Sequence, residues 1–268
     1  MTTSNAPIDF FADAVFSIAA RWRGEVDPVL TYAAMFDVLR QRRFSGKFLE
    51  LGGGYSTILA PVSLKLPSGA IHSVDFNPRK YRRILNSAKN SEAFLKQIHL
   101  YPGISVSFEQ VVEGLDEILN KISSYPPKKI QDAFATFGLG DLIQIDERQA
   151  WIAKVRELFL SHPAATEERV FYSSMDAMDG EKLCSAFVAE KAQFDAIFFD
   201  CGELSSIGEF ALMMPTMKCG SYVLLHDIYY PKSIKNFLVA IYLELDDSWE
   251  ILYLDNASPQ GGLVAIKL

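Results

Sequence analysis

The sequence of 268 residues has little cysteine and no extended basic segment. Its three cysteines, Cys184, Cys201 and Cys219, form neither a CxxC pair nor a regular framework. Disulfide bonds and a tetrahedral zinc site are therefore not expected, since zinc draws on closely spaced cysteine and histidine pairs. Free thiols are typical of proteins in a reducing compartment.

Long apolar runs are also absent, and none approaches the roughly 20 residues that span a bilayer. Residues 1–10 lack the charged segment followed by an apolar one that is typical of a secretion signal. The formal net charge is −7, whereas non-specific nucleic-acid binding needs a concentrated basic field. We therefore expect a cytoplasmic protein that binds neither a membrane nor nucleic acid.

The N-terminal part favours two helices. Apolar residues recur at helical spacing over residues 8–22. A second helix begins at Asp27-Pro28, an acid followed by proline at the first helical position, and ends at the basic cluster of residues 40–43. We expect residues 1–46 to form an N-terminal helical cap.

From residue 47 onward, short apolar runs alternate with helical segments, which is typical of βαβ units on a parallel sheet. Strands are predicted over residues 47–51, 70–76, 170–174, 194–200 and 222–226. The last two strands, residues 249–254 and 263–268, are joined too tightly for a crossover and should pair antiparallel. The expected class is α/β: a Rossmann-like, doubly wound, mostly parallel sheet of seven strands with an antiparallel C-terminal hairpin.

Residues from about 98 to 168 do not follow this rhythm and contain mixed amphipathic stretches. We interpret them as a helical insert within a domain of residues 47–268. An insert of this size in a compact α/β domain is most simply a lid or an interaction surface. It is also a reasonable surface for a homodimer.

A glycine-rich turn follows the first predicted strand. Glycine allows a ligand to approach the backbone closely, and the following helix N-terminus offers free N–H groups. The turn has no basic residue, which argues against a polyphosphate ligand, and Thr57 stands where a dehydrogenase GxGxxG pattern needs glycine. The turn and its borders comprise Glu50, Gly52, Gly53, Gly54, Tyr55 and Ser56.

Two acids strengthen the interpretation of this turn. Asp75 closes the second strand, roughly twenty residues beyond the glycines, where a carboxylate can accept both hydroxyl protons of a ribose. Glu50 lies inside the first strand, which is unusual for an acid unless its carboxylate has a partner. Together these elements predict a nucleoside-binding crevice at the carboxyl ends of parallel strands.

These residues, with the segments 50–57, 174–177 and 194–200, resemble class I S-adenosylmethionine-dependent methyltransferases. The Tyr-Ser-Thr after the glycines is most similar to the small-molecule O-methyltransferase branch. The resemblance covers about residues 47–63, 70–78 and 170–268. It implies S-adenosylmethionine as the cofactor and a small molecule as the methyl acceptor.

The resemblance also implies roles for single residues. Gly52 and Gly54 would pass under the methionine part of the cofactor, with Glu50 nearby. Asp75 would hold the ribose, and Phe76 would pack beside the adenine.

After the third strand, Asp176 and Ala177 match the place where the family contacts the adenine. The alternative for Asp176 is a cap on the helix that follows.

Polar side chains also follow the next two strands, with Asp200 at the end of the fourth and His226-Asp227 at the end of the fifth. They should converge at the ligand crevice, where Asp200 is also a candidate cofactor contact. In metal-dependent relatives, an acid after the fourth strand and an acidic or amide pair after the fifth hold a divalent ion. The histidine departs from the oxygen ligands that magnesium prefers and suits a softer ion or no ion at all.

Two other interpretations of this group stay open. His226 can serve as a general base with Asp227 beside it, because its ordinary pKa is near neutral. The pair can also simply satisfy a neighbouring loop.

The leading hypothesis is a methyltransferase that moves a methyl group from S-adenosylmethionine to a hydroxyl of a small molecule. The incomplete set of metal ligands and the insert motivate an alternative, a catalytically silent S-adenosylmethionine-binding partner protein. An NAD-dependent oxidoreductase is the third hypothesis, and Thr57 argues against it.

Overall fold

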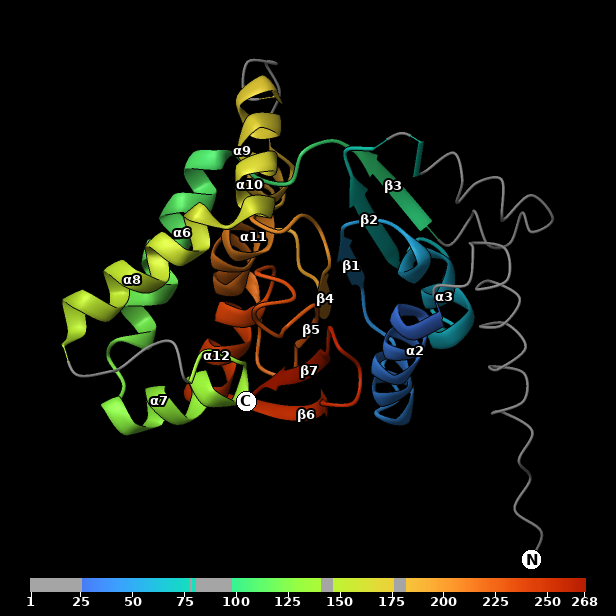
Figure 1. The fold of residues 1–268 in the computed structure, drawn as a ribbon. Coiled ribbons are helices and arrows are strands. Elements are labelled where there is room, and N and C mark those ends of the chain that lie inside the picture. The colour runs from blue at the N-terminus through green and yellow to red at the C-terminus, as the bar shows by residue number, and fades with distance from the viewer. Residues whose placement is uncertain (1–25, 78, 81–97, 141–146, 176–181) are drawn as a thin grey trace, which may run out of the picture.

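A computed structural model of the protein describes residues 26–77, 79–80, 98–140, 147–175 and 182–268 (Figure 1). The strands are β1 (Phe48–Leu51), β2 (Ile71–Asp75), β3 (Ile98–Pro102), β4 (Ala196–Phe199), β5 (Tyr222–His226), β6 (Trp249–Asp255) and β7 (Gly262–Lys267). The helices of the described residues are α2 (Val26–Gln41), α3 (Tyr55–Leu64), α6 (Phe108–Ile122), α7 (Pro127–Thr136), α8 (Arg148–Ser161), α9 (Pro163–Met175), α10 (Leu183–Ala189), α11 (Ser205–Met213) and α12 (Phe237–Leu245).

The strands form one seven-stranded sheet in the order β3-β2-β1-β4-β5-β7-β6. The first five strands in this order run parallel, and β7 pairs antiparallel with both β5 and β6. The winding reverses between β1 and β4, and ligands of open α/β sheets bind at such a point, outside the carboxyl ends of the strands. The predicted Rossmann-like fold class and its C-terminal hairpin are confirmed.

Helices cover both faces of the sheet (Figure 1). Alternate strand residues point to opposite faces, and Phe198 packs edge-on against Phe36 of α2, with the ring centroids 6.2 Å apart. Its neighbour Phe199 points the other way and packs against Phe210 of α11, at 5.7 Å. Burial on both faces explains why the inner strands have continuous apolar sequences.

The predicted third strand is wrong. Residues 170–174 belong to the helix α9, which has Pro163 at its first position. The third strand along the chain is β3, at the edge of the sheet, and it pairs parallel with β2. A short apolar run does not distinguish strand from helix by periodicity alone. The edge strand β3 is only partly buried and contains His99 and Tyr101, so its apolar signal is weak.

Residues 98–168 form more than an appended insert, because they supply the edge strand β3 and a core helix. A Cβ built on Gly114 of α6 would lie 2.9 Å from the Cα of Gly208 in α11, so the two helices approach backbone to backbone. The predicted helix over residues 8–22 lies outside the described residues, whereas the second predicted helix is α2. None of the described helices is long and apolar enough to cross a membrane.

Candidate functional site

The glycine turn joins β1 to α3 at the carboxyl edge of the sheet. Gly52 has φ of +99°, and a Cβ there would lie 2.1 Å from the backbone oxygen of Asp200. Glycine is thus required at position 52 by the end of the neighbouring strand. The amide of Gly53 donates to the carbonyl oxygen of Val74 at 3.2 Å. A Cβ on Gly54 would meet no atom within 4 Å, so the turn borders open space at this residue.

Glu50 is fully buried and joins three elements of the sheet edge. The hydroxyl of Ser73 donates to its Oε2 at 2.6 Å, and the hydroxyls of Ser56 and Thr57 also donate to this carboxylate. Burial raises the pKa of Glu50 to about 7, although the three hydroxyls act in the opposite direction. The acid inside the first strand therefore has internal partners and shapes the turn.

Thr57 has a second contact, which explains why it replaces the glycine of a dehydrogenase pattern. Its Oγ1 accepts a hydrogen bond of 2.9 Å from the amide of Gly54, as in a capping box. Tyr55 is the first residue of α3, directly after this amide.

Asp75 ends β2 with a buried carboxylate. Its Oδ1 accepts from the amide of Asn77 at 2.6 Å, and its Oδ2 lies 2.9 Å from Nζ of Lys80. The side chain of Lys80 is 44% exposed, whereas that of Asp75 is 2% exposed. For a ligand hydroxyl to reach this carboxylate, Lys80 must share or give up its contact.

A cavity of about 250 Å³ opens beside Phe76, where β2, β3 and β4 end. The ring of Phe76 lies 4.4 Å from that of Phe171 in α9, centroid to centroid. The volume lies below the range of roughly 300–1,000 Å³ of whole small-molecule sites and suits part of a nucleoside ligand. The other lining residues are Gly103, Ile104, Ser105, Glu167, Glu168, Tyr172, Cys201 and Gly202.

Asp176 and Ala177 lie outside the described residues. Their predicted role depended on a place after the third strand. Since the third strand is β3, that place belongs to the segment that starts at Gly103, and this segment lines the cavity.

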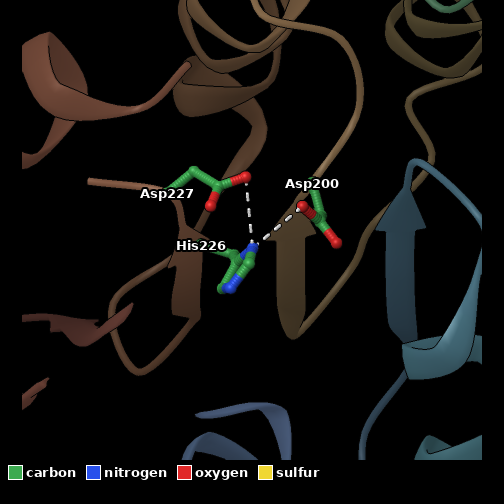
Figure 2. Close-up of side chains that lie close together, drawn as sticks. All are labelled: Asp200, His226 and Asp227. Atoms are coloured by element: carbon green, nitrogen blue, oxygen red, sulfur yellow. Dashed lines mark ion pairs between the residues drawn. The ribbon is translucent and has the colours of Figure 1, made fainter. Parts of the chain in front are cut away.

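The structure brings together Asp200, His226 and Asp227 at the adjacent ends of β4 and β5. Figure 2 shows Nδ1 of His226 facing both carboxylates, at 3.4 Å from Oδ1 of Asp200 and 3.3 Å from Oδ2 of Asp227. Asp227 adopts a left-handed backbone conformation with φ of +61°. The three side chains thus lie together, as expected from the ends of neighbouring strands, whereas their predicted roles at a ligand crevice stay predictions.

Burial alone would lower the pKa of His226, but the carboxylates of Asp200 and Asp227 outweigh it and raise the pKa to about 9. The side chain is 3% exposed. A buried imidazole that already holds its proton at neutral pH is a poor general base.

Two residues that the sequence did not single out complete the cluster. Nζ of Lys235 lies 2.9 Å from Oδ1 of Asp200 and 2.7 Å from Oδ2 of Asp227. The hydroxyl of Tyr32 in α2 donates to Oδ2 of Asp200 at 2.8 Å, and its ring lies edge-on to that of His226, 4.7 Å between centroids. Asp200 therefore has partners in α2, in β5 and in the loop before α12, and it is not among the residues that line the cavity.

The charges of the cluster stabilise one another. Burial would raise the pKa of Asp200 and of Asp227, but the ammonium of Lys235 and the ring of His226 lower both. In return, the two carboxylates raise the pKa of Lys235 against the effect of burial.

No family model and no curated protein matches the chain. Solved structures with a similar backbone include an O-methyltransferase from Bacillus cereus in complex with SAH, which is 12% identical over 100% of this chain and 93% of its own, with a TM-score of 0.48. Another is the O-methyltransferase TomG from Streptomyces achromogenes, involved in tomaymycin synthesis and in complex with SAM. It is 11% identical over 99% of this chain and 91% of its own, with a TM-score of 0.48. Because these sequence identities and TM-scores are low, we assign the fold from the strand order of the sheet and not from these similarities.

Proposed function

We propose that the protein is an S-adenosylmethionine-dependent methyltransferase that methylates a hydroxyl of a small molecule. The observation that carries this proposal is the position of the glycine turn, the Asp75 carboxylate and the aromatic cavity at one edge of the sheet. This edge adjoins the point where the winding reverses, at which open α/β sheets bind nucleotides.

Each part of the edge has a role in holding the cofactor. A carboxylate offers about four acceptor positions. Among the described residues Asn77 and Lys80 donate to Asp75, so its carboxylate can accept the ribose hydroxyls once Lys80 shares its contact. The rings of Phe76 and Phe171 offer apolar faces to the adenine. The open space beside Gly54 admits the methionine part.

S-adenosylmethionine, when bound, supplies a methyl group on a positively charged sulfur, which an acceptor oxygen takes up as its proton leaves to water. The contribution of the chain is to align the acceptor oxygen with the methyl group, and alignment by itself accelerates such reactions greatly. We assign His226 and Asp227 to positioning rather than to proton abstraction, because the carboxylates of Asp200 and Asp227 raise the pKa of His226 to about 9.

Asp75→Ala is expected to weaken binding of S-adenosylhomocysteine from the micromolar range by roughly 10- to 150-fold, the equivalent of a hydrogen bond to a charged group of about 1.5–3 kcal/mol. Isothermal titration calorimetry measures the change. Asp195→Ala is the matched control, because Asp195 accepts from the amide of Lys47 at the opposite edge of the sheet. Unchanged binding in a folded Asp75→Ala protein contradicts the ribose assignment.

The same titrations distinguish the alternatives. Tight binding of NAD with no binding of S-adenosylhomocysteine favours an oxidoreductase. Tight binding of S-adenosylhomocysteine without turnover on a panel of phenolic, sugar and alcohol acceptors favours a silent binding partner.

A further inference from the structure

The ends of β4 and β5 carry the ligand set of a metal site. One ligand atom each from Asp200, His226 and Asp227 lies within 4.8 Å of the others. A divalent ion that bound here would need the facing oxygens of both carboxylates, at about 2.0–2.6 Å.

Those facing oxygens already have a cation between them. Nζ of Lys235 lies 2.9 Å from Oδ1 of Asp200 and 2.7 Å from Oδ2 of Asp227. The same two oxygens are the ones nearest Nδ1 of His226. An ammonium group and a divalent ion cannot occupy this position together, because they repel each other and compete for the same oxygens.

The backbone that carries Lys235 is anchored on its C-terminal side by Asn236. The buried amide group of Asn236 donates to the carbonyl oxygens of Phe199 and His226, at 2.9 and 2.6 Å. Its backbone amide donates to the carbonyl oxygen of Asp227 at 3.2 Å. These contacts tie the loop to the ends of both strands that carry the carboxylates.

A second anchor lies on the N-terminal side. Oε2 of Glu203 accepts from the hydroxyl of Ser233 at 2.8 Å and from the amide of Ile234 at 3.0 Å. The Lys235 side chain is only 11% exposed. The ammonium is therefore held in place from both sides rather than resting on the surface.

We propose that Lys235 provides, from within the chain, the positive charge that a divalent ion would provide at this edge, and that Asp200, His226 and Asp227 bind no metal. This proposal runs against the sequence-based hypothesis of a metal site, which stays a prediction until metal binding is measured. An ammonium group has three N–H donors. Two of them face the carboxylates of Asp200 and Asp227. The proposal deepens the proposed function, because it assigns the charge at the ends of β4 and β5 to the chain itself.

Metal binding itself tests the proposal without reference to methyl transfer. Tag-free, chelator-treated protein is titrated with Mn²⁺ and with Zn²⁺ by calorimetry, and Mn²⁺ is also followed by electron paramagnetic resonance. Wild-type protein and Lys235→Arg, which keeps the charge, are expected to bind neither ion. Lys235→Ala is expected to bind one Mn²⁺ per chain at least 100-fold more tightly than wild type. The reason is that the carboxylates of Asp200 and Asp227 lose the ammonium group that competes with the ion.

The double variant Lys235→Ala/Asp227→Asn should lose the Mn²⁺ site again. One Mn²⁺ per wild-type chain, abolished by Asp227→Asn, overturns the proposal, as does a folded Lys235→Ala protein that binds no metal. If Lys235→Ala does not fold, Lys235→Met replaces it, and the wild-type titration still decides. Absence of methyl transfer in wild-type protein counts against the proposed function alone.

Discussion

Gly52→Ala is expected to destabilise the protein by at least about 3 kcal/mol, since it combines backbone strain with overpacking. The positive φ of this residue disfavours any side chain, and the new Cβ would lie 2.1 Å from the backbone oxygen of Asp200. Because that neighbour is backbone at the end of a central strand, no rotamer change can relieve the overlap. Urea unfolding followed by circular dichroism measures the loss.

Gly54→Ala is the matched control in the same turn. Its Cβ would meet no atom within 4 Å, and its backbone is extended, with φ of −177°. We expect a change in unfolding free energy within about 0.5 kcal/mol. If the cofactor fills the space beside Gly54, this variant nevertheless binds S-adenosylhomocysteine more weakly. Equal stability of Gly52→Ala and Gly54→Ala would contradict the packing argument.

Glu209→Gln is expected to stabilise the protein at pH 8 by up to about 3 kcal/mol and to have much less effect at pH 5. Glu209 in α11 is fully buried, and its Oε1 accepts from the hydroxyl of Ser105. Its Oε2 has no hydrogen-bond partner within the part of the chain that the structure describes. Burial raises its pKa from 4.5 to about 7, against the effects of Ser105 and of the thiol of Cys201, which both lower it.

The direction follows from where each state loses its proton. The unfolded chain releases it near pH 4.5 and the folded chain near pH 7, so the folded state binds more protons in this interval. The contribution of Glu209 to the free energy of unfolding therefore decreases as the pH rises from about 4.5 to about 7. Glutamine does not titrate, so the Glu209→Gln protein lacks this decrease. Urea unfolding of both proteins at pH 5 and pH 8 measures it; a difference that is the same at both pH values would argue against a raised pKa.

Glu50→Gln is a useful comparison, because burial raises the pKa of Glu50 to about 7 as well. This carboxylate accepts from three hydroxyls, whereas an amide has only one acceptor oxygen. We expect the loss of hydrogen bonds to offset much of the gain seen with Glu209→Gln.

The sequence predicted the inner strands well, because burial on both faces leaves a continuous apolar run such as residues 196–199. It missed the edge strand β3, which has one neighbour and partly exposed side chains, and it mistook the apolar stretch of α9 for a strand. Strand pairing is a tertiary property, so local sequence at an edge carries little of it.

The same distinction applies to the site. The meeting of Asp200 with His226 and Asp227 was predictable, because the carboxyl ends of neighbouring parallel strands lie at one edge. Lys235 was not predictable, because it reaches this edge from the loop between β5 and α12. Its direction is set by contacts with Glu203 and Asn236, which no local pattern encodes.

The contact of Tyr32 with Asp200 has a consequence for how the chain can be divided. The helix α2 also buries Met35, Phe36 and Leu39 completely against the sheet. Removing residues 1–46 would strip one wall from the acidic cluster and uncover an apolar face of the central strands. Residues 26–46 therefore belong to the same folded unit as the sheet, and a fragment starting at residue 47 should not fold autonomously.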